Sequence, residues 1–256
     1  MTTFPAGTFA PAPGRGRPVR MLVTQARTEA LLTLRNGEQV LLTLLIPLVL
    51  LVGLTLITVF PVSGSRIDAV TPRVLALAVM SSAFTGQAIA LGFDRRYGVL
   101  KRLAATALPR WLLVAGRVLA ELAVVAVQLV VLGVVAALLG WSPAPAGLLW
   151  AVLLVIMGTL AFGALGVLLG GALKAEVVLA LANILWFVLL LGGGIVVPAS
   201  SLGPLGDVVT LLPSGALAEG MRTALAGGTP GWSVFAVLAA WGAAAGALAT
   251  RTTRLS

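Results

Sequence analysis

The sequence has 256 residues, of which 59% are hydrophobic and only 10% are charged, against about 25% charged residues in soluble domains. A soluble globule of this length could not bury so much apolar surface, so the composition excludes a soluble protein and indicates a membrane protein. The net charge of +9 does not indicate nucleic acid binding, because the basic residues lie beside apolar runs, as membrane topology requires. The absence of cysteine and histidine excludes disulfides, thiolate nucleophiles, imidazole bases and most metal sites.

The N-terminal region contains two segments of different character. Residues 1–18 are rich in Pro, Gly and Thr and predict a disordered cytoplasmic arm. No short apolar core with a cleavage site follows Arg15 and Arg17, so the arm is not a signal peptide. In residues 19–37 apolar side chains recur at steps of three and four, which predicts an amphipathic helix in the plane of the membrane interface. The polar side of this pattern holds Arg20, Thr24, Arg27, Thr28 and Arg35.

Six apolar segments follow, each near the roughly 20 residues that cross the hydrocarbon. The expected fold is therefore an all-α integral membrane protein, with residues 19–256 as a single transmembrane domain. The expected spans are 38–60, 72–92, 109–139, 146–170, 177–197 and 231–250. Lysine and arginine collect on the cytoplasmic side of membrane proteins, and this topology leaves three of the 17 basic residues outside, Arg66, Arg73 and Arg222. Both termini are expected in the cytoplasm.

Residues 198–228, between the fifth and sixth spans, are apolar but too often interrupted to form a further span. The interruptions are Pro198, Gly203, Pro204, Gly206 and Pro213. We expect two short re-entrant helices that enter the outer leaflet, with protein contacts satisfying their backbone. The glycines at 192–194 would let the fifth span bend or end just before this segment.

No arrangement of residues indicates catalysis. Ser81 and Ser82 of the second span have no histidine base, and we expect them to bond to backbone or to a neighbouring helix. Neither lysine follows a glycine, as the phosphate-binding motif GxxxxGK[ST] requires. The chain is therefore expected to be no enzyme and to hold no cofactor or metal. If ATP drives the protein, another subunit binds it.

Few polar side chains are expected inside the spans. Glu121 is the single deep carboxylate, and an ion-coupled carrier would need such a group. Arg117 lies four residues earlier, so an i,i+4 ion pair is the expected role of Glu121. The amides of Gln87, Gln128 and Asn183 could touch a substrate, but such groups more often bond helix to helix.

Two pairs of glycines have the GxxxG spacing that lets helix backbones approach closely. They are Gly166 with Gly170 and Gly242 with Gly246. Packing within one subunit and contact between subunits are both compatible with this spacing.

The stretch DRRYGVLKRLAATALPRW, residues 94–111, holds five of the 17 basic residues, Arg95, Arg96, Lys101, Arg102 and Arg110. Its residues also have helical periodicity. Tyr97, Leu100, Ala104 and Leu108 fall on one face, and Arg95, Arg102 and Thr106 on another. Residues 94–108 are therefore predicted to form a short amphipathic helix that docks in a groove of another protein.

The segment YGVLKRLAATALPRW resembles the cytoplasmic coupling segment of type-2 ABC exporter permeases, the family of daunorubicin-type drug-resistance pumps. That family usually reads Tyr or Phe, Gly-Thr-Leu, a basic pair, Leu, then Ala-Thr-Pro-Leu-Pro. The matching residues are Gly98, Leu100, Lys101, Arg102, Leu103, Thr106, Leu108 and Pro109. Val99 replaces the usual Thr, and Ala107 replaces the usual first Pro.

A second segment, LLPSGALAEGMRTALAGG, is similar to the outer segment of the same family, where a Pro precedes an acidic residue and an Arg three positions later. Pro213, Glu219 and Arg222 fit this pattern, and Gly227 and Gly228 follow it. Glu219 and Arg222 are also spaced for a simple ion pair on a helix.

The resemblance implies the transmembrane subunit of an ATP-driven exporter in a bacterial cytoplasmic membrane. It implies a second permease subunit, identical or related, and two copies of a separate ABC ATP-binding subunit that hold ATP and Mg. It assigns coupling to Arg95, Arg96, Tyr97, Gly98, Leu100, Lys101, Arg102, Leu103 and Thr106. It assigns an outer gate to Pro213, Glu219 and Arg222.

The expected cargo is a hydrophobic or amphiphilic compound, such as a drug, a lipid or a lipid-linked metabolite, because few charges are buried. Two other functions stay compatible with the sequence. One is a membrane scaffold or assembly factor without a transport cycle. The other is an ion-coupled secondary carrier, which the shortage of deep carboxylates disfavours.

Overall fold

The computed structural model describes residues 16–57, 64–105, 109–197 and 202–252. Within these ranges the regular structure is entirely helical, as the sequence predicts. The first elements are α1 (Pro18–Arg35), α2 (Gly37–Leu56), α3 (Arg66–Met80), the π-helix η1 (Ser81–Gly86), α4 (Gln87–Arg96) and α5 (Val99–Ala104). They are followed by α6 (Arg110–Leu138), the 3₁₀ turn η2 (Pro145–Gly147), α7 (Leu148–Ala172), α8 (Ala175–Gly192), α9 (Leu205–Thr210), α10 (Pro213–Leu225) and α11 (Trp232–Thr252).

Five helical stretches are long and apolar enough to cross a membrane. They are Arg66–Arg96, Trp111–Leu138, Pro145–Ala172, Ala175–Gly192 and Trp232–Thr252, and they match the second to sixth expected spans. The first expected span corresponds to α2, whose apolar stretch Thr43–Leu56 is shorter, and residues 58–60 of that span lie outside the described residues. The protein is thus a multi-pass membrane protein, and the sixth crossing stays a prediction.

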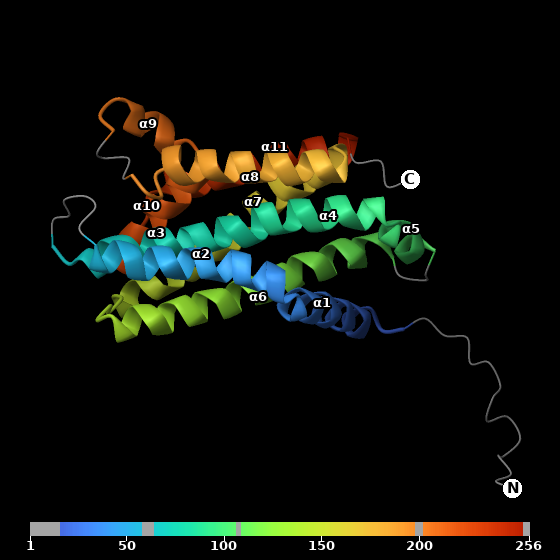
Figure 1. Ribbon diagram of the computed structural model, residues 1–256, viewed down its shortest axis with the longest axis horizontal. Coiled ribbons are helices and arrows are strands. Elements are labelled where there is room, and N and C mark those ends of the chain that lie inside the picture. Colours follow the sequence, from blue (N-terminus) through green and yellow to red (C-terminus); the bar gives the residue numbers. More distant parts are fainter. Residues whose placement is uncertain (1–15, 58–63, 106–108, 198–201, 253–256) are drawn as a thin grey trace, which may run out of the picture.

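The long helices run lengthwise in one bundle (Figure 1). At one end, here called the α5 end, α5 lies beyond the last turn of α4 and the first turn of α6. At the other, here called the α9 end, α3 begins and α9 packs on α10. The two predicted functional segments, 94–108 and 198–228, therefore lie at opposite ends of the molecule.

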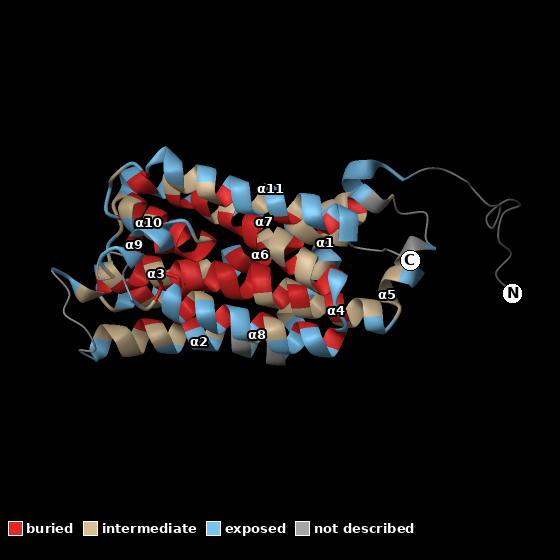
Figure 2. Ribbon diagram, turned by 90° about the horizontal axis from the view of Figure 1, so that it is seen from above, coloured by how far each residue is buried: buried red, intermediate tan, exposed pale blue. Residues whose placement is uncertain are grey.

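The central element is the continuous helix formed by α3, η1 and α4. Its most apolar stretch is 78% buried, against 17–33% in the other four long helices. Buried residues are concentrated along α3, whereas the outer helices show mixed burial (Figure 2). The helix contacts α2, α6, α7, α8 and α10, so it is covered on most sides by protein.

Small residues allow a close contact between α7 and the central helix. A Cβ at Gly166 would lie 2.8 Å from the carbonyl oxygen of Phe84, and a Cβ at Gly170 would lie 2.5 Å from that of Ala88. Both glycines are therefore needed for backbone approach within one subunit. Of the other pair, Gly242 faces Ala161 and joins α11 to α7, whereas Gly246 faces open space.

The segment between α8 and α11 forms two short helices, α9 and α10, as predicted, and their entry into the outer leaflet stays a prediction. α8 ends at Gly192, five residues before the expected end, and Gly194 has a φ of +82°, which a glycine adopts without strain. Ten of the thirteen residues of α10 are buried. Because α3, α7 and α9 cover it, protein rather than lipid surrounds most of α10.

α1 is a helix, as predicted, and it lies along the first half of α6. Gln25 packs on Gly116, and one turn later Ala30 packs with Ala120 and Val124, so contacts advance in the same direction along both helices. The exposed side of α1 holds Arg20, Arg27 and Arg35. The location of α1 at the membrane interface stays a prediction.

The single helix predicted over 94–108 is wrong in its extent. α4 continues to Arg96, the chain turns at Gly98 with a φ of +67°, and only the six residues of α5 form a separate helix. Helical periodicity continues through Gly98 in the sequence, but the left-handed conformation of this glycine ends the helix. Thr106 and Leu108 lie outside the described residues.

We predict that Gly170→Ala destabilises the bundle, whereas Gly163→Ala in the same helix does not. The new methyl group at 170 would overlap the backbone of Ala88, while a Cβ at 163 meets nothing within 4 Å. Overpacking of this kind costs about 1–3 kcal/mol in the free energy of unfolding. Thermal unfolding of the two variants in detergent tests this, and equal melting temperatures would contradict the backbone contact.

Candidate functional site

Three consecutive charged residues end α4, and we call Asp94, Arg95 and Arg96 the α4 clamp. Arg95 points toward the C-terminal end of α7. Its Nη1 donates to the carbonyl oxygens of Gly170 at 3.0 Å and of Leu173 at 3.3 Å. The last carbonyls of a helix lack intrahelical partners and carry partial negative charge, so a guanidinium there is favourable.

The other two members of the clamp form ion pairs. Asp94 pairs with Arg117 of α6, with side chains 26% and 18% exposed, whereas the pair between Arg96 and Glu176 of α8 is 49% and 62% exposed. Water screens the second pair more, so the first contributes more to stability. The clamp thus joins the end of α4 to α6, α7 and α8.

The predicted ion pair between Arg117 and Glu121 is wrong, since Arg117 pairs with Asp94. The i,i+4 spacing places two residues on one face of a helix but does not decide between local and non-local partners. Here α4 and α6 approach each other at the α5 end, so that Asp94 at the end of α4 pairs with Arg117.

The exposed part of the basic stretch is smaller than its sequence suggests. Tyr97 is 64% exposed, and Lys101 and Arg102 are exposed on α5; we call these three residues the coupling surface. Arg102 donates from Nη2 to the carbonyl oxygen of Tyr97 at 3.2 Å and so spans the turn. The ring of Tyr97 stacks on Phe93 with centroids 6.0 Å apart, which orients it at the surface. Leu100 is partly buried, and the side chain of Leu103 lies outside the described residues.

At the α9 end, the predicted gate residues lie together on α10. Arg222 donates from Nε to Oε2 of Glu219 at 2.9 Å and from Nη2 to Oε1, a two-point contact. These hydrogen bonds raise the pKa of Arg222 above its ordinary value. Pro213 is buried at the first position of α10, where the missing N–H costs nothing.

A family model described as ABC-2 type transporter matches residues 21–225, from α1 to the end of α10. The chain belongs to the ABC-2 type transporter family. No curated protein matches the chain.

The protein is therefore the membrane subunit of an ABC-2 type transporter. Permease domains of this family lack ATPase activity, typically carry no cofactor and generally pair with ATP-binding subunits.

The buried amides of this ABC-2 permease join helices, as the sequence favours. Gln87 of α4 donates from Nε2 to Oε2 of Glu121 on α6, and Gln128 of α6 donates to Oγ1 of Thr43 on α2 at 2.9 Å. Asn183 is different, since it is exposed and donates to the carbonyl oxygen of Leu179 in its own helix at 2.8 Å. Among the described residues this amide forms no hydrogen bond to another helix.

Two features of the site could not be predicted from the sequence. The first is the π-helix η1, where Trp186 of α8 donates from Nε1 to Oγ of Ser81 at 2.8 Å. The sequence predicts a bond from Ser81 to a neighbouring helix but not the partner or the wide turn. The second is Arg73 on α3, which lies within electrostatic range of Glu219 and Arg222.

We predict that Arg95→Gln lowers the free energy of unfolding by about 1–2 kcal/mol, because it removes a cation and its hydrogen bonds from the end of α7. Lys101→Gln is the matched control, since it removes the same charge from an exposed position six residues away. Its effect should stay within about 0.5 kcal/mol. Chemical unfolding of both variants in mild detergent measures the difference. Equal stability would show that Arg95 does not hold α7.

Proposed function

We propose that this permease is half of the membrane pathway of an ATP-driven exporter of the drug-resistance type. The α5 end faces the cytoplasm in this proposal, because basic residues collect there and such residues stay on the cytoplasmic side. Among the described residues they include Arg17, Arg20, Arg95, Arg96, Lys101, Arg102, Arg110, Arg117, Lys174 and Arg251. The other half of the pathway is a second copy or a related chain.

The observation that carries the proposal is the position of α5. It packs mainly on α4 and projects beyond the end of the bundle, between the central helix and α6 (Figure 1). A short cationic helix in this place suits docking in a groove of an ATP-binding subunit, of which two copies would serve two permease halves.

The α4 clamp gives a physical account of how movement of α5 would reach the membrane. A displacement of α5 acts first on the end of α4, next to the turn at Gly98. Because Asp94, Arg95 and Arg96 hold α6, α7 and α8, the same displacement acts on those helices. Thus Arg95 and Arg96 contribute to coupling as positioning residues, while the coupling surface contacts the ATPase.

The cargo in this proposal is a drug, a lipid or a lipid-linked metabolite. Charged side chains are scarce in the described apolar helices, and most of the lining available to a pathway is aliphatic. The permease supplies shape and apolar surface, and ATP hydrolysis occurs on the partner subunit.

We predict that Arg102→Glu leaves the protein folded in the membrane and reduces ATP-dependent transport about tenfold or more. The reason is that repulsion between like charges replaces an attraction between the coupling surface and the ATPase. Arg251→Glu makes the same charge change at the exposed end of α11 and should transport normally. The assay is co-purification with the ATPase, followed by ATP hydrolysis and transport of candidate amphiphiles in liposomes.

Normal transport and normal substrate-stimulated ATP hydrolysis by the Arg102→Glu protein would refute the coupling assignment. A wild-type permease that neither binds an ATPase nor alters its turnover would instead favour the scaffold function.

We predict that Glu219→Ala reduces transport severalfold while protein abundance changes less than twofold, because it releases Arg222 at the outer gate. Asp207→Ala on α9 removes an exposed carboxylate from the same end and is the control. Immunoblots of membranes and transport rates give the two quantities. A parallel loss of abundance and transport would assign Glu219 a structural role alone.

A further inference from the structure

Arg73 is a cation in an apolar part of the bundle that lacks a bonded counter-charge. It lies seven residues after Arg66, about 10 Å along α3, with Pro72 and Val74 buried on either side. Among the described residues it has no hydrogen bond and no ion pair. An arginine at this position is costly unless an anion accompanies it.

The neighbouring charges do not supply that anion. Glu219 lies within electrostatic range of Arg73, but both of its oxygens accept hydrogen bonds from Arg222. Arg222 itself repels Arg73, so the three side chains together carry one excess positive charge. The other acidic residues of this end, Asp68 and Asp207, are exposed and form no ion pair with Arg73.

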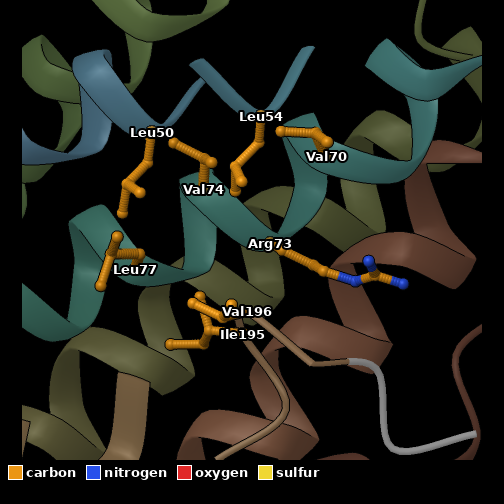
Figure 3. A pocket seen from close by; sticks show the side chains of 8 residues that line it. All are labelled: Leu50, Leu54, Val70, Arg73, Val74, Leu77, Ile195 and Val196. Atoms are coloured by element: carbon orange, nitrogen blue, oxygen red, sulfur yellow. The ribbon is translucent and has the colours of Figure 1, made fainter. Parts of the chain in front are cut away.

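Beside Arg73 the surface is apolar and hollowed. A pocket between α2, α3 and the segment after α8 is lined by Arg73 together with Leu50, Leu54, Val74, Leu77, Ile195 and Val196. The aliphatic side chains lie around the pocket, while the guanidinium of Arg73 extends away from most of them (Figure 3). The free space is that of about one water molecule, so a ligand would lie along the mouth of the pocket.

We propose that Arg73 binds the carboxylate or phosphate headgroup of an anionic amphiphile, whose apolar chain lies against the pocket. A guanidinium binds both groups through two parallel hydrogen bonds, which explains an arginine here. A free anion without an apolar chain would make no favourable contact with the aliphatic residues of the pocket. It would also lose hydration on approaching them. The identification of this ligand as cargo rests on the proposed function, but its binding does not.

The test is binding of tetradecyl phosphate to the purified full-length protein in a neutral maltoside detergent, counted by native mass spectrometry. Arg73→Gln should weaken binding at least about tenfold, the loss of a two-point charged contact. Arg66→Gln removes the same charge from the same helix outside the pocket and should stay within about twofold. The affinity of Arg73→Lys should fall between those of wild type and Arg73→Gln. Lysine keeps the positive charge but cannot form the two parallel hydrogen bonds of a guanidinium.

Further ligands separate the headgroup from its alternatives. Tetradecyltrimethylammonium should show no dependence on Arg73, and millimolar inorganic phosphate should not displace tetradecyl phosphate. Unchanged binding by Arg73→Gln overturns the proposal, as does an equal loss in Arg66→Gln or displacement by inorganic phosphate.

If Arg73→Gln fails to fold, Val196→Trp decides the question, because it fills the pocket and keeps the cation. This variant should lose tetradecyl phosphate binding, and full retention would overturn the proposal. No ATPase takes part in these measurements. A negative result here therefore leaves the coupling experiment with Arg102→Glu unaffected, and the failure of coupling would leave this binding site standing.

Discussion

The close contact between α7 and the central helix is the constraint on which the rest of the bundle depends. Gly166 and Gly170 bring the backbone of α7 against the carbonyls of η1 and α4. The α3 part of the central helix is buried mainly by α2 and α10. The contact at the two glycines also places the C-terminal end of α7 within reach of Arg95. The packing of α4 on α7 and the geometry of the charged end therefore both depend on these two glycines.

The two ends of the molecule use arginine in different ways. At the α5 end each arginine of the α4 clamp has a bonded partner, so these charges hold helices together and leave the coupling surface exposed. At the α9 end Arg222 has its carboxylate, while Arg73 lies beside an aliphatic pocket and pairs with no carboxylate of the described residues. The missing partner is the reason why we assign a ligand to Arg73 and not to Arg222.

The sequence predicts the helices well, because an apolar run of about 20 residues in a membrane must satisfy its own backbone hydrogen bonds, which an α-helix does. It also predicts the pair between Glu219 and Arg222 and the end of α8 at its glycines, since these are local patterns. The sequence does not predict the partner of Arg117, which is Asp94 of another helix. Nor does it predict the partners of Arg95, which are backbone carbonyls 75 or more residues away. Such partners depend on how helices pack, which periodicity does not encode.

The wide turn η1 has a geometric consequence for the whole central helix. A π-turn contains one more residue than an α-turn, so side chains beyond Gly86 are offset by about 100° from the positions that a regular helix would give them. Restoring ordinary α-turns there would swivel α4 about its own axis without requiring α3 to move. Such a rotation would move Asp94, Arg95 and Arg96 around the helix axis together, because all three lie on α4.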